Sequence, residues 1–268
     1  MTRLRLTKHH GLGNDFLVVF HPPVADLPEL ARRLCDRRRG VGADGLLVAE
    51  TAEGYAAEMV LFNADGTRAE MSGNGIRCFA QALAMRRGDL DDQLVSTDAG
   101  DRLLVLSATD DPSTIDVRVE MGTVDPLDEP SGWARLECHP DRPVAHLSLG
   151  NPHSVVGVDE VAVVDLVDLG GRVPHVNLEI IEPGPESNAV TMRVHERGVG
   201  VTEACGTGAV ASAAAARSWG LVPATSDVVV HMAGGDVVVE LDDSRPPSAV
   251  LVGPATYIGD IEVEVPAS

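Results

Sequence analysis

Two short stretches decide the fold: MSGNGIRCFAQALAMRR at residues 71–87 and EACGTGAVASAAAARSW at residues 203–219. In each, a glycine-rich tetrapeptide, Ser72-Gly73-Asn74-Gly75 or Cys205-Gly206-Thr207-Gly208, precedes a run of apolar residues. The two tetrapeptides begin 133 residues apart, close to half of the 268-residue chain. We therefore predict that each opens the central helix of one of two related domains.

The residues after each tetrapeptide follow a helical pattern. From Ile76 onward, apolar residues recur at the spacing of one helix face, which predicts a helix over Gly73–Arg87. The run Gly206–Trp219 is almost entirely small and apolar, so we expect a second helix there, buried at the centre of its domain.

A second matched pair supports the duplication. Leu12-Gly13-Asn14 is repeated as Leu149-Gly150-Asn151, which lies 137 residues later, close to the first offset. The sequence therefore predicts an α+β fold with two pseudo-symmetric domains, each a mixed sheet wrapped around a central helix. We expect the active site in the cleft between the domains.

Other segments fill in this outline. An amphipathic run predicts a helix over Asp26–Arg38, with Asp26 as its N-cap. The strands that alternation and β-branched residues predict are 3–7, 16–20, 58–62, 115–121, 190–195, 228–232, 237–241 and 261–265.

Composition excludes several functional classes. The formal net charge of −20 would repel phosphate backbones and anionic lipid, so we expect no nucleic-acid or membrane partner. The chain has no run of 18 apolar residues, and residues 1–16 lack the apolar stretch of a signal peptide. We therefore expect a cytoplasmic protein.

The four cysteines point to thiol chemistry rather than to a metal. Cys35, Cys78, Cys138 and Cys205 form no C-x-x-C pair, so we predict no metal site and free thiols throughout. A free cysteine is usually a small buried apolar residue, and only its local surroundings can indicate more.

Cys205 has such surroundings because it stands directly before a helix. Helix N-termini expose unpaired N–H groups and carry a partial positive charge, and glycines let an anion approach the backbone closely. Each tetrapeptide is thus a candidate carboxylate-binding turn with a hydroxyl or thiol at its edge. The same field lowers the pKa of a thiol, which favours Cys205 as a thiolate base. The alternative is that Cys205 only packs beneath its helix.

Five motifs, in order along essentially the whole chain, resemble those of diaminopimelate epimerases. They are residues 8–16 (KHHGLGNDF), 62–66 (FNADG), 73–78 (GNGIRC), 150–153 (GNPH) and 196–208, which opens with Glu196-Arg197-Gly198 and closes with Ala204-Cys205-Gly206-Thr207-Gly208. Members of that family interconvert LL- and meso-diaminopimelate without pyridoxal phosphate or metal. Two cysteines flank the α-carbon, so that one removes a proton and the other delivers one to the opposite face. The resemblance implies an amino-acid substrate and a homodimer.

The sequence agrees independently that no pyridoxal phosphate is used. That cofactor requires a lysine for its Schiff base, and the chain has only Lys8, near the end of a predicted N-terminal strand. We therefore expect no cofactor.

The resemblance also implies roles for other residues. Backbone N–H groups of Gly73, Asn74, Gly206 and Thr207 would bind the reacting carboxylate. Glu196 would bind the distal ammonium and Arg197 the distal carboxylate. The remaining substrate contacts would be the amides of Asn14, Asn63, Asn151 and Asn177. His153 is expected to have a structural role, and the domains would comprise 1–122 with 254–268, because the last strand returns to the first domain, and 123–253.

One position departs from the family pattern. The first catalytic cysteine aligns with Ser72, since Gly73-Asn74-Gly75 fixes the register, and Cys78 lies inside the helix as a packing residue. A serine hydroxyl is a much weaker acid than a thiol. Three explanations remain open: an engineered replacement of the cysteine, a natural variant in which Ser72 does slow acid–base work, and a lost or altered activity.

The same motifs leave two other functions open. The same fold could carry a racemase of another amino acid, or a non-catalytic amino-acid-binding protein that kept the cleft. A nucleotide enzyme is disfavoured because neither glycine turn has the G-x-G-x-x-G pattern after a strand and no P-loop lysine is present.

Overall fold

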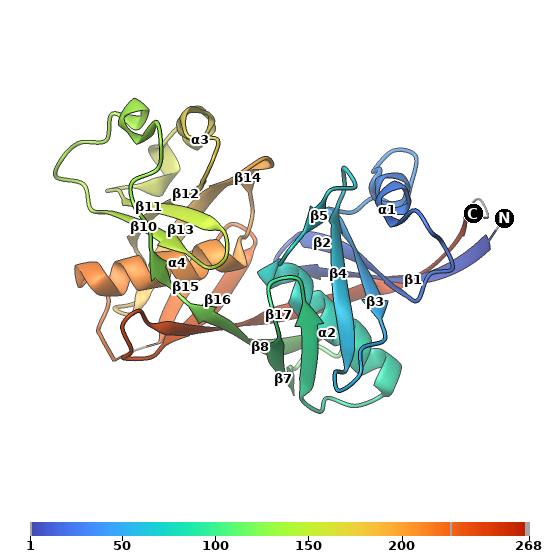
Figure 1. Cartoon of the computed structure of the whole chain (residues 1–268). Coiled ribbons are helices and arrows are strands. Elements are labelled where there is room, and N and C mark those ends of the chain that lie inside the picture. The colour runs from blue at the N-terminus through green and yellow to red at the C-terminus, as the bar shows by residue number, and fades with distance from the viewer. Residues whose placement is uncertain (1, 226, 266–268) are drawn as a thin grey trace. The chain divides into compact units, whose positions relative to one another are not determined.

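The computed structural model describes residues 2–225 and 227–265 and shows a mixed α/β fold of mostly strands, with four α-helices in the described residues (Figure 1). The chain folds into two compact units: unit 1 is Met1–Val119 with Gly253–Ser268, and unit 2 is Glu120–Val252. None of the helices in the described ranges is long and apolar enough to cross a membrane.

Unit 1 contains one buried and one peripheral helix among its strands. Its elements are β1 (Thr2–Gly11), β2 (Asn14–Phe20), α1 (Leu27–Cys35), β3 (Gly45–Glu50), β4 (Ala57–Asn63), β5 (Arg68–Ala69), α2 (Gly73–Arg87), β6 (Gln93–Thr97), β7 (Arg102–Ala108), most of β8 (Thr114–Thr123) and the end of β17 (Ser248–Val265).

Unit 2 holds the remaining elements in a similar order. They are β9 (Asp125–Pro126), the 3₁₀ helix η1 (Trp133–Leu136), β10 (Val144–Ser148), β11 (Pro152–Gly157), the 3₁₀ helix η2 (Val161–Val163), α3 (Leu166–Arg172), β12 (Asn177–Pro183), β13 (Ala189–Glu196), β14 (Gly200–Thr202), α4 (Gly206–Trp219), β15 (Val228–Met232), β16 (Gly235–Leu241) and the start of β17.

Strand pairing has the same directions in both units. In unit 1, β1–β2, β3–β4 and β6–β7 are antiparallel, whereas β2–β3 and β4–β6 are parallel. In unit 2, β10–β11, β12–β13 and β15–β16 are antiparallel, whereas β11–β12 and β13–β15 are parallel. A parallel pair needs a long crossover, and the four α-helices lie in these four crossovers.

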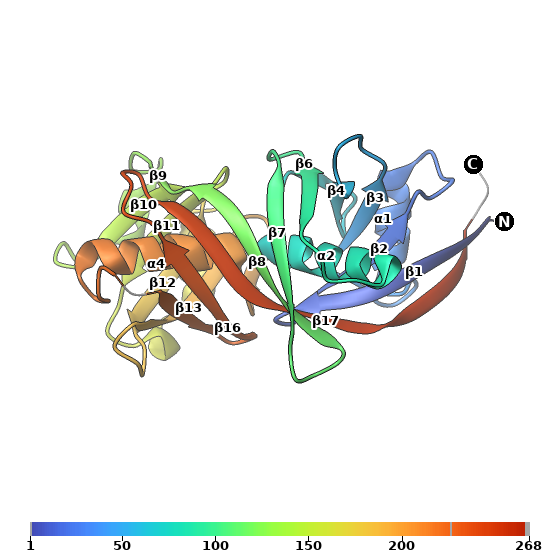
Figure 2. The same cartoon turned by 90° about the horizontal axis from the view of Figure 1, so that it is seen from below.

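The helices α2 and α4 are the buried ones. Every residue from Gly73 to Ala84 of α2 is buried, and the helix contacts β1, β2, β3 and β4. Gly206 to Ala216 of α4 are buried as well, against β10 to β13, β15 and β16. Figure 2 shows each helix against the strands of its own unit. The small alanine side chains of α4 allow this close contact with the strands.

The two-sided burial of β2 and β3 follows from the alternation of their side chains. Leu17 and Leu46 pair across the strands and join the core that also contains Leu30 of α1. Val18 and Leu47, the next pair, point to the opposite face and are fully buried too. Continuous apolar runs such as these are typical of strands with both faces covered.

Most of the predicted elements are confirmed. Helices α2 and α4 have the predicted bounds, and the predicted strand runs lie within β1, β2, β4, β8, β13, β15, β16 and β17. The helix predicted over Asp26–Arg38 ends early, at Cys35, because Asp36 has the non-helical angles φ −58° and ψ 115° and its carboxylate accepts the N–H groups of Arg38 and Arg39. Helix α3 was not predicted, because its Gly170-Gly171 pair is a poor helix former. The strands that were not predicted are β3, β5, β6, β7, β9, β10, β11, β12 and β14.

Candidate functional site

The N-terminus of α2 carries the first half of the candidate site. Ser72 is the N-cap, with extended backbone angles of φ −141° and ψ 123°, and its Oγ accepts a hydrogen bond from the N–H of Gly75 at 3.0 Å. Gly73 and Asn74 in the first turn are buried, whereas Ser72 is half-buried. The hydroxyl therefore stands at the edge of a turn of backbone N–H groups.

The N-terminus of α4 has the same build with a thiol in place of the hydroxyl. Cys205 is the N-cap at φ −136° and ψ 114°, and its Sγ lies 3.6 Å from Oγ1 of Thr207. Only 5% of Cys205 is exposed. Gly208 is required for packing, because a Cβ there would stand 2.7 Å from Oε1 of Glu179.

The asparagine of each Leu-Gly-Asn turn bonds to the first turn of the buried helix in its own unit. Asn14 Oδ1 accepts a hydrogen bond from Nδ2 of Asn74 at 3.2 Å, and Nδ2 of Asn151 donates to Oγ1 of Thr207 at 3.4 Å. Asn74 and Thr207 both lie two residues after the capping residue of their helix. The repeated motifs in the sequence thus correspond to repeated contacts in the structure.

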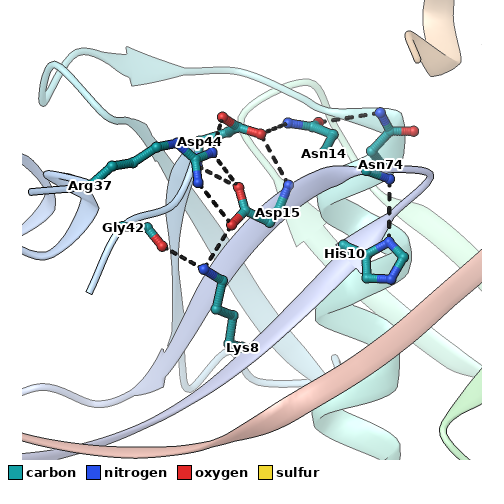
Figure 3. Close-up of polar contacts among 9 residues, drawn as sticks. Lys8, His10, Asn14, Asp15, Arg37, Gly42, Asp44 and Asn74 are labelled. Atoms are coloured by element: carbon teal, nitrogen blue, oxygen red, sulfur yellow. Dashed lines mark hydrogen bonds and ion pairs between the residues drawn. The ribbon is translucent and has the colours of Figure 1, made fainter. Parts of the chain in front are cut away.

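A charged cluster supports Asn14 in unit 1 (Figure 3). Asp15 forms ion pairs with Lys8 at 2.8 Å and with Arg37 at 2.6 Å, and Arg37 also pairs with Asp44 at 2.7 Å. Burial by itself would raise the pKa of Asp15, but the hydrogen bonds from Arg37 and Lys8 outweigh it and hold the pKa below its usual value. Lys8 additionally donates to the carbonyl of Gly42.

Arg37 and Asp44 are site residues that were not predicted from the sequence. Asp44 Oδ2 accepts from Nδ2 of Asn14 at 2.7 Å and from the N–H of Asp15 at 3.0 Å. The only signal in the sequence was the position of Asp15 directly after Asn14. The partners Arg37 and Asp44 lie 22 and 29 residues from Asp15, and nothing local marks them.

A fully buried guanidinium lies beneath the first turn of α2. Arg77 donates to the carbonyl of Gly73 at 3.0 Å, to Oδ1 of Asn74 at 2.9 Å and to the carbonyl of Pro254 at 3.1 Å. Burial lowers its pKa to about 10, so it remains protonated at neutral pH. The described residues therefore place a positive charge beside the Ser72 turn.

Unit 2 has carboxylates in the corresponding place. Glu179 and His153 are both 0% exposed, and Glu179 Oε1 lies 2.7 Å from Nδ1 of His153. Nε2 of His153 lies 3.0 Å from Oδ1 of Asn151. Both ring nitrogens of His153 are thus engaged, one by a carboxylate and the other by a side-chain amide. Glu179 Oε2 has no hydrogen-bond partner among the described residues.

Glu196 is the second carboxylate near Cys205. Burial raises its pKa, and the hydroxyl of Thr202, whose oxygen lies 2.5 Å from Glu196 Oε1, offsets this only in part. The pKa of Cys205 is raised well above its usual value by burial first, and then by the charges of Glu196 and Glu179.

The expectation that the helix N-terminus lowers the Cys205 pKa is therefore wrong for the protein without substrate. The N–H of Gly208 and the hydroxyl of Thr207 do favour the thiolate, but burial and the two carboxylates outweigh them. Burial and the two carboxylates therefore favour the neutral thiol of Cys205 over its thiolate. Cys78 is buried within α2, where burial raises its pKa to about 12, consistent with a packing role.

The remaining predicted contacts lie in the same two units. Asn63, at the end of β4, is exposed, and its Nδ2 donates to Oγ1 of Thr67. Asn177, at the start of β12, accepts the N–H of Arg197 at 2.9 Å, and the side chain of Arg197 is exposed. Unit 1 thus holds Asn14, Asn63, Ser72, Gly73 and Asn74. Unit 2 holds Asn151, Asn177, Glu196, Arg197, Cys205, Gly206 and Thr207.

Neither Lys8 nor the acidic side chains of the described residues offer a cofactor or metal ligand set. Lys8 is engaged by Asp15 and by the carbonyl of Gly42. Among residues 2–225 and 227–265, no group of three or more His, Cys, Asp or Glu side chains has an arrangement that could hold a metal ion.

Comparison with known proteins identifies relatives over nearly the whole chain. The family model described as diaminopimelate epimerase matches residues 6–126 and 146–258. The diaminopimelate epimerase of Desulfitobacterium hafniense is 38% identical, and the match covers 95% of this chain and 96% of that protein. Those of Sphingopyxis alaskensis and Methanocella arvoryzae are 37% and 36% identical, covering 97% and 100% of this chain and 97% and 100% of their own lengths.

Solved structures with low sequence identity share the fold. The crystal structure of a Bacillus anthracis phenazine biosynthesis protein of the PhzF family has a TM-score of 0.79 at 14% identity, covering 99% of this chain and 100% of that one. A hydroxyproline epimerase from Agrobacterium vitis, solved with bound trans-4-OH-L-proline, has a TM-score of 0.72 at 17% identity, covering 97% and 92%. At these identities the comparison supports a common fold.

Proposed function

We propose that this chain, which belongs to the diaminopimelate epimerase family of isomerases in lysine biosynthesis, inverts one α-carbon of diaminopimelate by proton transfer between LL- and meso-isomers. One observation carries the proposal: two glycine-led helix N-termini of the same build, one presenting the Ser72 hydroxyl and the other the Cys205 thiol. Each also has an asparagine from a Leu-Gly-Asn turn bonded to its first turn.

In the proposed complex, one substrate molecule is bound by residues of both units. The reacting carboxylate accepts hydrogen bonds from the N–H groups of Gly73, Asn74, Gly206 and Thr207. These donors and the helix dipoles would stabilise the negative charge that spreads onto that carboxylate when the α-proton leaves. The division into domains 1–122 with 254–268, and 123–253, is part of this proposal.

The raised Cys205 pKa fits a base that substrate activates. The substrate brings a second ammonium group, which we place beside Glu196, with Arg197 on the distal carboxylate. A cation there would offset the carboxylate charge that holds Cys205 protonated, so the thiol would lose its proton more readily when substrate is bound. Asn14, Asn63, Asn151 and Asn177 would fix the distal amino-acid group by neutral hydrogen bonds.

In each turnover the α-proton moves to one flanking group, and the opposite group returns a proton to the other face of the carbanion. Cys205 can take either part, because a thiol donates and accepts a proton more readily than a hydroxyl, and bound substrate would offset the carboxylates that hold it protonated. Ser72 is a poor partner, since its hydroxyl neither loses nor accepts a proton readily. We therefore expect slow inversion from a serine at this position. We also expect a homodimer, which light scattering would measure.

Heavy water separates exchange from inversion. We expect one isomer of diaminopimelate to exchange its α-hydrogen for deuterium, followed by proton NMR, faster than it inverts, followed by chiral chromatography. Cys205→Ser should abolish the exchange, whereas Cys138→Ser, which changes a half-buried thiol that has no proposed role, should leave it intact.

The outcomes of this experiment distinguish the alternatives. Tight binding of diaminopimelate with neither exchange nor inversion would identify a binding protein and refute the proposed isomerisation. Exchange with another amino acid, and none with diaminopimelate, would identify a racemase of a different substrate on the same fold.

A further inference from the structure

We propose that Asp44 and Arg77 are positioning residues. Together they fix the orientation of the side-chain amides of Asn14 and Asn74, so that the oxygen and the NH₂ group of each amide have defined neighbours. The inference deepens the proposed function and rests on it for the role of the two asparagines at the substrate. An amide side chain has a donor end and an acceptor end of nearly equal size, so packing alone does not decide its orientation. A neighbour that can only donate or only accept does decide it.

Arg77 fixes one end of this chain of contacts. Its guanidinium is 0% exposed and can only donate. Nη2 donates to Oδ1 of Asn74 at 2.9 Å, while Nη1 and Nε are held by the carbonyls of Gly73 and Pro254. The oxygen of Asn74 must therefore face Arg77, and Nδ2 must face the other way, toward Oδ1 of Asn14.

Asp44 fixes the opposite end (Figure 3). Oδ2 of Asp44 accepts hydrogen bonds from Nδ2 of Asn14 at 2.7 Å and from the N–H of Asp15 at 3.0 Å. Oδ1 of Asp44 accepts a hydrogen bond from Nη2 of Arg37 at 2.7 Å. All three neighbours donate, so only a group that accepts on both sides satisfies them. A carboxylate does, and a neutral amide at position 44 does not.

Arg77 and Asp44 impose compatible orientations on the two asparagines that lie between them. Arg77 sets Asn74, Asn74 presents its NH₂ to the oxygen of Asn14, and Asn14 then presents its own NH₂ to Asp44. Reversing either amide would bring two donors or two acceptors together. For Asn74 this would leave the buried Arg77 guanidinium without its acceptor, and for the half-buried Asn14 it would place two oxygens against each other at Asp44. The donor and acceptor edges that the two amides offer a substrate are thereby fixed before it binds.

A close contact supports a fixed arrangement. A Cβ on Gly11 would lie 3.1 Å from Nη2 of Arg77 and 3.3 Å from Cβ of Asn74, so β1 is packed tightly against both side chains. This packing limits the freedom of the Arg77–Asn74 pair to rearrange.

The unmodified protein provides the first test. Because Asn14 Nδ2 and the N–H of Asp15 share one oxygen of Asp44, we expect a nuclear Overhauser effect between these protons. The chain has six asparagines, so labelling with ¹⁵N-asparagine gives few side-chain signals to assign. Absence of this effect, once both signals are assigned, would overturn the orientation.

Asp44→Asn is the second test, with Asp98→Asn as its matched control. Asp98 forms an exposed ion pair with Arg68 in the same unit, so the control removes the same charge without touching the asparagines. We expect Asp44→Asn to shift the side-chain signals of both Asn14 and Asn74, whereas the control shifts neither. An unchanged Asn74 signal in folded Asp44→Asn would refute transmission through the two amides.

Binding of diaminopimelate gives the functional readout. By titration calorimetry we expect the dissociation constant of Asp44→Asn to be about tenfold higher than that of the unmodified protein, the effect of one mismatched polar contact. The control should bind unchanged. Equal affinities of both variants would show that Asp44 does not position the asparagines for substrate. If the unmodified protein does not bind diaminopimelate, the proposed function fails, and the NMR experiments still decide the orientation.

Discussion

The N-termini of α2 and α4 have the same backbone conformation but differ in the charged groups that surround them. Both begin with an extended capping residue followed by Gly-x-Gly, and both are buried in their own unit. Ser72 has the buried guanidinium of Arg77 beneath its helix turn, whereas Cys205 has the carboxylates of Glu179 and Glu196 nearby. A duplicated backbone can therefore place a capping oxygen or sulfur in opposite electrostatic surroundings.

The asparagines of the two Leu-Gly-Asn turns differ in a related way. Asn14 presents its oxygen to Asn74 of α2, because the carboxylate of Asp44 takes its NH₂ group. Asn151 presents its NH₂ group to Thr207 of α4, and its oxygen lies 3.0 Å from Nε2 of His153. The two asparagines therefore offer opposite ends of their amides to the helix of their own unit.

Ser72→Cys should have the largest effect on this comparison. A thiol beside the N-terminus of α2 and Arg77 has surroundings that favour its thiolate, so both flanking groups could then transfer protons. We expect inversion of diaminopimelate to rise by about 10³-fold, in the range that a positioned acid–base group contributes. Chiral analysis of the product measures it.

The control for this substitution is Ser72→Ala, which removes the hydroxyl without adding an acid. If Ser72→Cys were no faster than Ser72→Ala, position 72 would have no part in proton transfer, and the assignment of the two flanking groups would be wrong.

Alanine at the second glycine of each turn should have the next largest effect, because it should change the free energy of unfolding differently for α2 and for α4. In Gly208→Ala the new Cβ meets Glu179 Oε1 at 2.7 Å, and Glu179 is held by His153, so we expect a loss of about 2 kcal/mol in the free energy of unfolding. In Gly75→Ala the Cβ meets Ser72 Cβ at 3.1 Å, and the gain in helix propensity offsets the strain to within about 1 kcal/mol.

The two units can be followed separately in this experiment. Both tryptophans, Trp133 and Trp219, lie in unit 2, so their fluorescence in urea reports Gly208→Ala. Hydrogen exchange of the α2 amides reports Gly75→Ala. Equal losses in both variants would contradict the difference in packing.

Glu196→Gln should have the smallest effect, on the reactivity of Cys205. The Glu196 carboxylate raises the Cys205 pKa by destabilising the thiolate, so its removal lowers that pKa and increases the thiolate fraction at any pH below it. At pH 8 we expect alkylation of Cys205 by iodoacetamide to become about tenfold faster, because the reactive thiolate is more populated. Peptide mass spectrometry resolves Cys205 from Cys138.

The matched control is Glu203→Gln, since Glu203 is exposed and lies two residues before Cys205. This control removes one negative charge near the same helix N-terminus, but the carboxylate that it removes is exposed to solvent. An unchanged alkylation profile in Glu196→Gln, or an equal change in Glu203→Gln, would mean that Glu196 has no specific influence on the thiol.

The bounds of α2 and α4 could be predicted because their signals are local. Glycines mark each start, and an apolar pattern continues for about four turns, as expected for a helix of 14 or 15 residues. By contrast, α3 has seven residues and two adjacent glycines, and its crossover between β11 and β12 is defined by strand pairing. Short elements of this kind depend on contacts that no local pattern contains.

Sequence alone identified the duplicated turns, the capping Ser72 and Cys205, and the asparagines of the Leu-Gly-Asn motifs, because each lies within a few residues of a recognisable pattern. Only the tertiary structure placed Asp44 against Asn14 and Glu179 beside Gly208, which are 30 and 29 residues apart along the chain. It also reversed the expected direction of the Cys205 pKa. The physical reason is that a pKa and an amide orientation are set by burial and by charges across space, which spacing along the chain does not specify.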